Sequence, residues 1–181
     1  NRIEKEGPLP DFLNGLGKVQ PALRRVPGTA VFLSPRRDTT PLALQAEVAH
    51  NHVLHEKVLI VSVEYVSVPH VDADDQLCVQ WLGHGLFKIM HVLYRVGYRD
   101  KADVPKALTL ARKRGLLERN LDLEHASYFI SRMMITATDA PGMSRERKKI
   151  FITMARNSSS SITHFGLPSE RTVMMGSQVE V

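Results

Sequence analysis

The chain lacks the features that mark several large classes of protein. It has one cysteine, Cys78, among 181 residues, so no intrachain disulfide can form, and this usage suits a reducing compartment. No apolar run approaches the roughly 20 residues that a bilayer-spanning helix needs, and the polar start carries no signal peptide. Because the start also lacks a methionine, we expect a piece of a longer protein, whose other parts stay unknown.

Familiar catalytic and phosphate-binding motifs are missing as well. The sequence contains no G-x-S-x-G elbow, no Walker loop and no G-x-G-x-x-G after a strand. The acidic stretch DADD (72–75) crowds its carboxylates into a loop, where solvated side chains are the expected outcome. A carboxylate pair stays open as an alternative, but no spacing points to it. We therefore predict that the chain is not an enzyme.

Aromatic residues are few and do not alternate with basic ones. They make up 6% of the chain, which gives no stacking platforms for bases, so we predict no nucleic-acid partner. Lys and Arg exceed Asp and Glu by 24 to 19. A basic surface of this kind also suits a phosphate-bearing ligand or the anionic face of a membrane.

Three histidines precede an apolar run in HNHVLHEKVLIVSV (50–63). On a helix, His50 and His52 point to nearly opposite sides, and Glu56 lies on a different azimuth from the pair His52 and His55. A zinc site needs ligands that converge, so we predict no metal here. The favoured interpretation is the joint between a helix and a strand, where polar side chains satisfy free backbone groups.

What is present is an alternation of strand and helix patterns. β-rich runs bounded by turn residues predict strands, and apolar residues at helical spacing predict helices. Thr40 before Pro41 predicts a capped helix start, and GHG (83–85) predicts a β-hairpin. The expected strands cover 28–34, 57–66, 77–82, 86–96, 126–138 and 171–181, and the expected helices cover 41–52, 105–115, 144–157 and 159–165.

These elements predict an α/β fold. Its sheet is mixed and mostly parallel, with about six strands, one β-hairpin and three or four flanking helices. The consecutive strand, helix and strand at 28–66 predict a right-handed crossover unit.

The start of the third predicted helix is a candidate anion site. GMSRER (142–147) offers a glycine turn, the cap residue Ser144 and two arginines, Arg145 and Arg147, at a helix N-terminus. The alternative is that these arginines are ordinary solvated charges.

Several motifs together resemble one known family. They stand in the same order and spacing as in the C-terminal region of Kup-type (KUP/HAK/KT) potassium uptake permeases, over about residues 8–181. The motifs are VPGTAVFLS (26–34), HNHVLHEKVLIVSV (50–63), DVPKAL (103–108), SYFISR (127–132), ARNSSS (155–160) and GSQVEV (176–181).

The resemblance implies a place in a transporter. Kup-type proteins are proton-coupled potassium importers, in which a membrane part handles the potassium ion and the proton. The chain would then be the cytoplasmic C-terminal α/β domain (27–181), preceded by a membrane-proximal linker (1–26). It would lie at the cytoplasmic face of the inner membrane, with the transmembrane part of the same chain as its partner.

The resemblance also singles out residues. Leu54, His55 and Glu56 coincide with the family's LHE, which we interpret as the joint before the buried strand. The rival interpretation makes His55 part of a ligand pocket at the edge of the sheet. Asn157, in ARNSSS, matches another motif position.

SYFISR carries the second set of matched positions, Tyr128, Phe129, Ser131 and Arg132. We expect Phe129 to face the core and Arg132 to pair with a carboxylate or contact a ligand phosphate. The family's glutamate after this arginine is Met133 here.

We compare three possible functions of this domain. The first is a regulatory and assembly domain that senses an adenine nucleotide such as cyclic di-AMP, in a homodimer. The second is a purely structural dimerisation domain with no small ligand. The third, an independent enzyme, is disfavoured because no catalytic constellation is visible. No cofactor is expected apart from the regulatory nucleotide.

Overall fold

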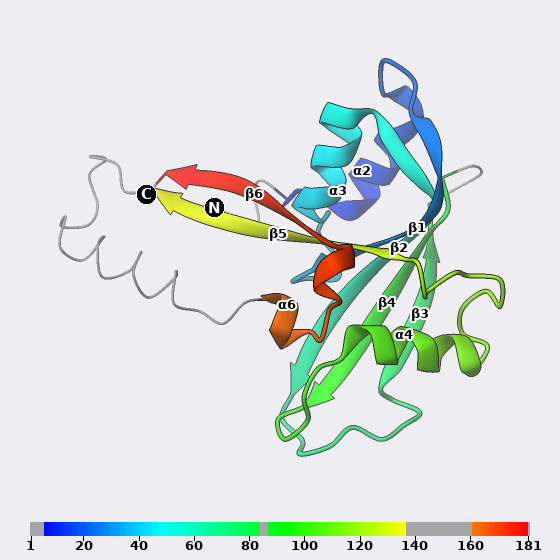
Figure 1. Ribbon diagram of the computed structural model, residues 1–181, viewed down its shortest axis with the longest axis vertical. Helices are drawn as coiled ribbons and strands as arrows, with labels where there is room; N and C mark the ends of the chain where they lie inside the picture. The colour runs from blue at the N-terminus through cyan, green and yellow to red at the C-terminus, as the bar shows by residue number, and fades with distance from the viewer. Residues whose placement is uncertain (1–5, 84–86, 137–160, 181) are drawn as a thin grey trace.

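The computed structural model describes residues 6–83, 87–136 and 161–180 and shows one six-stranded sheet (Figure 1). The spatial order is β3-β4-β2-β1-β5-β6, and only β3 is antiparallel to its neighbour. The predicted α/β class, the mostly parallel sheet and the single hairpin are confirmed. The strands are β1 (Arg24–Ser34), β2 (Val53–Val66), β3 (Leu77–Leu82), β4 (Ile89–Gly97), β5 (Ser127–Thr136) and β6 (Thr172–Glu180).

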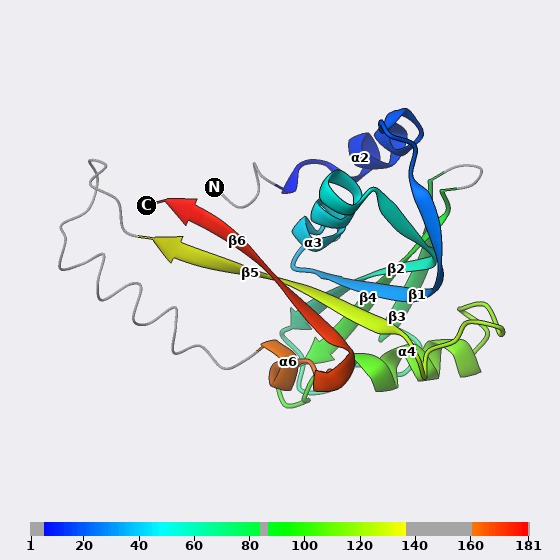
Figure 2. The same ribbon diagram turned by 45° about the horizontal axis from the view of Figure 1, so that its top comes forward.

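Helices cover both faces of the sheet (Figures 1 and 2). One face carries α2 and α3, and the other carries α4 and the short α6. Ile162 of α6 and Phe165, which follows α6, pack on the core under α4. The helix predicted over 144–157 lies outside the described residues. The bounds are α2 (Leu9–Gly15), η1 (Leu16–Lys18), α3 (Leu42–Ala46) with its π-helical continuation η2 (Glu47–Asn51), α4 (Val104–Lys113), α6 (Ser161–His164) and η3 (Ser169–Arg171).

The central strands are apolar on both faces because both faces are covered. In β2, Val58 and Ile60 pack under α2 and α3, while Leu59 and Val61 pack under α4. Successive strand residues point to opposite faces, so a strand buried on both sides needs a continuous apolar run. This is why the run at 58–61 predicted a parallel-type strand.

The strand order makes β1 the point where the chain reverses direction across the sheet. From β1 the chain moves to β2 and then to β4 on one side, and it later returns to place β5 on the other side of β1. This arrangement is doubly wound, with its switch point between β1 and β5. In such sheets, the crevice outside the carboxyl ends of the strands at the switch point is the usual ligand site.

Past the residues that pair with β1, β5 continues with β6 as a two-stranded ribbon (Figures 1 and 2). Only Ser127–Phe129 of β5 pair with β1, whereas β5 pairs with β6 from Tyr128 to Thr136. The outer half of β5 therefore has one neighbouring strand instead of two.

The start of α3 differs from the prediction. The cap residue is Pro41, and the hydroxyl of Thr40 is buried without a hydrogen-bond partner among the described residues. The amide of Ala43 instead donates to Oγ of Ser131 in β5, at 2.9 Å. A residue 88 positions away therefore supplies the acceptor, which no local pattern reveals. The helix ends as expected, at His52, which adopts a left-handed conformation with φ 52°.

The amino-terminal segment packs on the sheet. Leu9 and Leu16 are 3% and 2% exposed and belong to the core under α2 and α3. Pro8 forms an isolated bridge with Thr39, so the segment is also tied to the loop after β1. The boundary at residue 26 stays a prediction, but residues on both of its sides contribute to one core.

Candidate functional site

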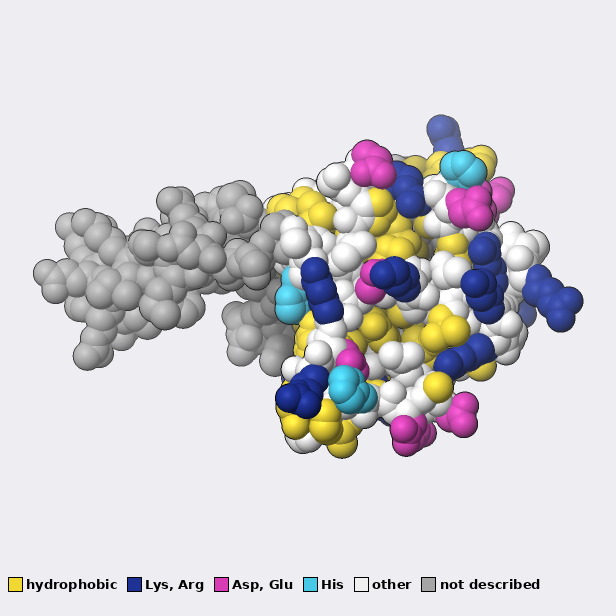
Figure 3. All heavy atoms as spheres, turned by 60° about the horizontal axis from the view of Figure 1, so that its bottom comes forward, with side chains coloured by type: hydrophobic (Ala, Val, Ile, Leu, Met, Phe, Trp, Pro, Cys, Tyr) yellow, Lys and Arg dark blue, Asp and Glu magenta, His cyan; other side chains and the backbone are white. Residues whose placement is uncertain are grey.

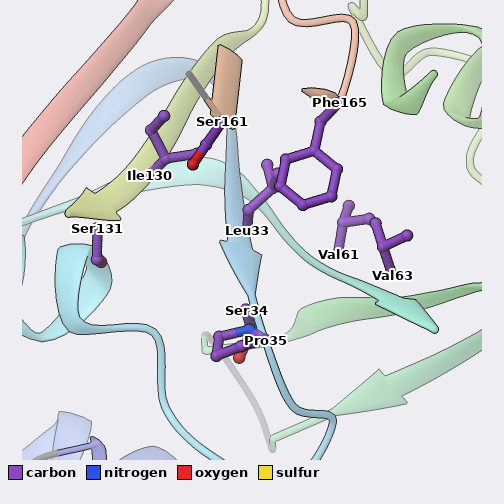
Figure 4. Close-up of a pocket in the computed structure, with 9 residues that line it drawn as sticks. All are labelled: Leu33, Ser34, Pro35, Val61, Val63, Ile130, Ser131, Ser161 and Phe165. Atoms are coloured by element: carbon purple, nitrogen blue, oxygen red, sulfur yellow. The ribbon is translucent and has the colours of Figure 1, made fainter. Parts of the chain in front are cut away.

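A cavity of about 210 Å³ opens at the switch point, between the carboxyl end of β1 and the middle of β5, just past the part of β5 that pairs with β1 (Figure 4). Neighbouring residues of β2 and the segment of α6 complete its wall. Most of the lining is apolar, with three serines among the apolar side chains. The lining residues are Leu33, Ser34, Pro35, Val61, Val63, Ile130, Ser131, Ser161 and Phe165.

Two of the three serines are held in place by hydrogen bonds. The hydroxyl of Ser34 donates to the carbonyl of Arg36, at 2.7 Å. The hydroxyl oxygen of Ser131 accepts from the amide of Ala43 at 2.9 Å, which leaves its own hydrogen free to donate. Fixed polar groups in an apolar wall orient a ligand at little entropic cost.

Residues 161–165, which comprise α6 and the following Phe165, form one wall of the cavity and are held by contacts with two other elements. The amide of Val104, at the start of α4, donates to the carbonyl of Phe165 at 2.9 Å. His164 Nε2 lies 2.6 Å from the hydroxyl of Tyr65, at the end of β2, and burial raises the pKa of that tyrosine. Phe165 therefore holds its position in the wall through contacts with two other elements.

The lining favours binding over catalysis. None of the lining residues carries a carboxylate, imidazole, thiol or ammonium group, so they supply no acid–base pair for proton transfer. An apolar slot with hydroxyls at its edge suits a flat group with its own donors and acceptors, such as a nucleobase. The volume lies below the roughly 300 Å³ at which drug-sized pockets begin.

The LHE residues lie at the opposite edge of the sheet from this cavity. They begin β2, whereas the cavity lies at the carboxyl ends of the strands. Leu54 is fully buried in the core, and Nδ1 of His55 lies 3.4 Å from Oε1 of Glu47. The backbone carbonyl of Glu56 accepts from Nη2 of Arg25 at 2.8 Å. The joint is thus held by Glu47 and Arg25.

Several polar atoms near this joint are buried without a hydrogen-bond partner among the described residues. Among the described residues, Oε2 of Glu47 and Nδ1 of both His52 and His55 form no hydrogen bond. No group of three or more His, Cys, Asp or Glu side chains in the described parts of the chain is arranged to hold a metal ion. The cluster is therefore a polar joint, and its residues do not reach the switch-point cavity.

SYFISR runs along β5 beside the cavity. Phe129 faces the core as expected and stacks on Phe32, with ring centroids 4.7 Å apart. Tyr128 is buried on the opposite face, where desolvation raises its pKa. Ser131 lines the cavity, so this motif contributes one of its serines. The side chain of Arg132 lies outside what the structure describes, as do Ser144, Arg145, Arg147 and Asn157.

The sequence did not reveal Ser34, Ser161 and Phe165 as site residues. No motif joins them, and they come from β1, α6 and the turn after α6. The signal that places Ser34 beside Ser131 is the strand order, which puts β1 next to β5.

Basic side chains do not gather into one patch on the face of the molecule that Figure 3 shows. Lys and Arg side chains are scattered there among hydrophobic, acidic and other polar ones. On this face, nothing resembles the continuous basic stripe of a nucleic-acid-binding surface.

The fold and the cavity thus define a doubly wound α/β domain with a small cavity at its switch point. The family model described as "K+ potassium transporter C-terminal domain" matches residues 27–181, and the chain belongs to this family.

Curated relatives are similar over nearly the whole chain. The probable potassium transport system protein Kup of Rhodococcus jostii (strain RHA1) is 39% identical over 180 residues, which is 99% of this chain and 27% of that protein. The protein of the same name from Thiobacillus denitrificans (strain ATCC 25259 / T1) is 40% identical over 182 residues, 99% of this chain and 28% of that protein. The chain thus spans little more than a quarter of these relatives.

Two further findings concern solved structures and membrane-spanning helices. No solved structure matches this chain. Within residues 6–83, 87–136 and 161–180, no helix has the length and hydropathy of a membrane-spanning segment.

Proposed function

We propose that this domain regulates a Kup-type potassium transporter by binding a cytoplasmic adenine nucleotide, such as cyclic di-AMP, in the switch-point cavity. The transmembrane part of the same chain carries the potassium ion and the coupled proton. The domain lies on the cytoplasmic side of the inner membrane and performs no reaction of its own. Ligand binding shifts transport only through a difference in affinity between two states of the protein.

The observation that carries the proposal is the lining of the cavity. Its apolar walls and the fixed serines Ser34 and Ser131 suit the flat face and polar edge of a purine. Its volume of about 210 Å³ holds a base, so the phosphates of a dinucleotide extend outside. The predicted anion site at Ser144 to Arg147 lies in the chain between β5 and α6, which both line the cavity.

Calorimetric titration of the 181-residue chain with cyclic di-AMP, ATP and AMP tests the proposal. We expect saturable heat with at least one of them. Replacing Val63, which lines the cavity, by phenylalanine fills the space and lowers the affinity at least about tenfold, since each factor of ten is 1.4 kcal/mol.

The matched control is Val66→Phe, on the same strand but not in the lining. This variant keeps the affinity of the unchanged chain. No heat with any of the three nucleotides, or equal loss in both variants, contradicts the proposed function.

A second candidate function is dimerisation through the β5–β6 ribbon. Outside the reach of β1, the ribbon has one strand pair, and isolated two-stranded units are marginally stable in water. On β6, Val173 and Met174 are 44% and 41% exposed. A second copy that covers these side chains removes apolar surface from water and pairs a free strand edge.

Light scattering during size-exclusion chromatography tests this alternative. The unchanged chain elutes as a dimer, and Met174→Lys shifts it to a monomer because a lysine on an edge strand opposes pairing. Lysine at Tyr98, which is exposed elsewhere on the surface, leaves the dimer intact. A monomer at all concentrations for the unchanged chain removes this candidate.

A further inference from the structure

A second, larger cavity lies between α2 and the outer strands of the sheet. Its volume is about 330 Å³, at the lower end of the range for small-ligand pockets. It shares no lining residue with the switch-point cavity. Its lining combines apolar and polar side chains from α2, the loop after β1, and strands β3 and β4. The lining residues are Leu9, Pro10, Leu13, Asn14, Arg37, Asp38, Gln80, Leu82, Gly83 and His91.

His91 is the buried polar group of this cavity. It is 3% exposed and lies on the same face of β4 as the buried Ile89 and Leu93. Burial, aided by the charge of Arg37, lowers its pKa, so the imidazole is neutral near pH 7. A neutral imidazole has one nitrogen that donates and one that accepts.

The hydrogen bonds of Ser62 decide which nitrogen of His91 accepts. The single hydroxyl hydrogen of Ser62 is directed to the carbonyl of Arg36, at 3.1 Å. The oxygen of Ser62 then accepts from Nε2 of His91, at 3.0 Å. Nε2 therefore carries the proton and Nδ1 is the acceptor. No described residue donates a hydrogen bond to Nδ1.

Arg37, which lines this cavity, is a cation without a salt-bridge partner among the described residues. Asp38 pairs with Arg36, with Oδ1 of the aspartate 3.1 Å from Nε of the arginine. Arg37 is exposed and forms no salt bridge with the described residues. A ligand anion at the mouth would therefore meet Arg37 without displacing an existing partner.

We propose that this cavity binds a small organic anion whose flat or apolar body carries a hydroxyl or amino donor. The donor bonds Nδ1 of His91 inside the cavity, and the carboxylate or phosphate pairs with Arg37 at the mouth. Leu9, Leu13 and Leu82 cover the body of the ligand. This site is independent of the proposed function and of the switch-point cavity.

Titration of the ¹⁵N-labelled 181-residue chain with simple aromatic acids tests the site. The probes are 4-hydroxybenzoate and 4-hydroxyphenylacetate, which differ in length, together with benzoate and phenylacetate, which lack the donor. We expect saturable chemical-shift changes at residues 9–14, 80–82 and 91. We expect each hydroxylated acid to bind about tenfold more tightly than the acid of the same length without the hydroxyl. This ratio of dissociation constants corresponds to a hydrogen bond worth about 1.4 kcal/mol.

Two variants assign the contacts. In Arg37→Gln, binding of both hydroxylated acids weakens about tenfold, while Arg99→Gln, at an exposed arginine outside the lining, keeps the affinity within about twofold. In His91→Gln, the side-chain amide replaces Nε2 as the partner of Ser62 and Nδ1 is lost. Hydroxylated and plain acids then bind equally.

Three results would overturn the proposal. One is the absence of saturable shifts with any of the acids at about 10 mM, a concentration that detects even millimolar binding. Another is an equal effect of the two arginine variants. The third is a set of shifts centred on residues 33–35, 61–63 and 161–165, which line the other cavity.

Discussion

His91 is an ionisable side chain held inside a parallel sheet. Its pKa lies below the ordinary 6.5, mainly because burial disfavours the cation. In the unfolded chain the same imidazole takes up a proton near pH 6.5, whereas in the folded chain it does so only at lower pH. The unfolded state therefore binds more protons in this window, and folding stability falls as the pH drops below about 6.5.

Replacing His91 by glutamine should flatten this part of the pH dependence. Between pH 7.5 and 5.5, the unchanged chain loses stability with a slope from His91 of at most about 1.4 kcal/mol per pH unit, which the variant lacks. Urea unfolding at the two pH values measures the difference. His50→Gln changes an exposed histidine and keeps the slope of the unchanged chain. Equal slopes in both variants would show that His91 does not resist protonation in the fold.

At the scale of the element, α3 shows how a helix is fixed from outside its own sequence. Its first turn is tied to β5 by the bond from the Ala43 amide to Ser131. The same serine lines the switch-point cavity, so the helix start and the cavity wall share one side chain.

The variants Ser131→Ala and Thr40→Val separate the two candidate caps. Loss of the Ser131 acceptor costs about 1 kcal/mol, as for other helix caps, because the Ala43 amide is left unsatisfied. Thr40→Val removes a buried hydroxyl that has no partner among the described residues, so stability stays the same or rises. Free energies of unfolding in urea measure both. If Thr40→Val lowers the free energy of unfolding more than Ser131→Ala does, Thr40 caps the helix as the sequence predicted.

The elements that local patterns specify were predictable. β3 has the predicted bounds, the helix over 41–52 ends with His52 as its cap residue, and α4 begins at Val104, one residue before the predicted start. These depend on side-chain period, turn residues and caps within a few positions. β2 begins four residues before the predicted start, because Val53, Leu54 and His55 already pair with β1.

The candidate site was less predictable than the fold. Ser131 came from a motif, but its neighbour Ser34 depends on β1 and β5 lying side by side, which is long-range information. No sequence motif marks His91, whose Nε2 lies 3.0 Å from the hydroxyl of Ser62 on the neighbouring strand β2. The LHE residues lie at the joint before β2 and do not line the switch-point cavity.

At the scale of the whole molecule, one sheet separates two apolar cores. The strands contribute alternate side chains to each core, so the two cores share the same strands. The amino-terminal segment belongs to this unit, since Leu9 and Leu16 pack beside residues of β1, β2 and β4.

Leu16→Ala tests whether residues 1–26 are part of the folded unit. Removing this buried side chain should lower the free energy of unfolding by about 2–5 kcal/mol, in a single transition. Leu116→Ala, at a leucine that is 41% exposed, should cost less than about 1 kcal/mol. Fluorescence and circular dichroism during urea unfolding report both values. If Leu16→Ala behaves like Leu116→Ala, the segment is a linker without a structural role.

The direction of β6 limits how far this protein can be shortened. Because β6 runs alongside β5 in the same direction, the polypeptide must travel back the length of the ribbon before β6 can begin. For the nine residues of β6 this is about 30 Å, or roughly nine extended residues. Deletions between 137 and 160 that leave less than this would prevent β6 from pairing with β5 in the parallel direction.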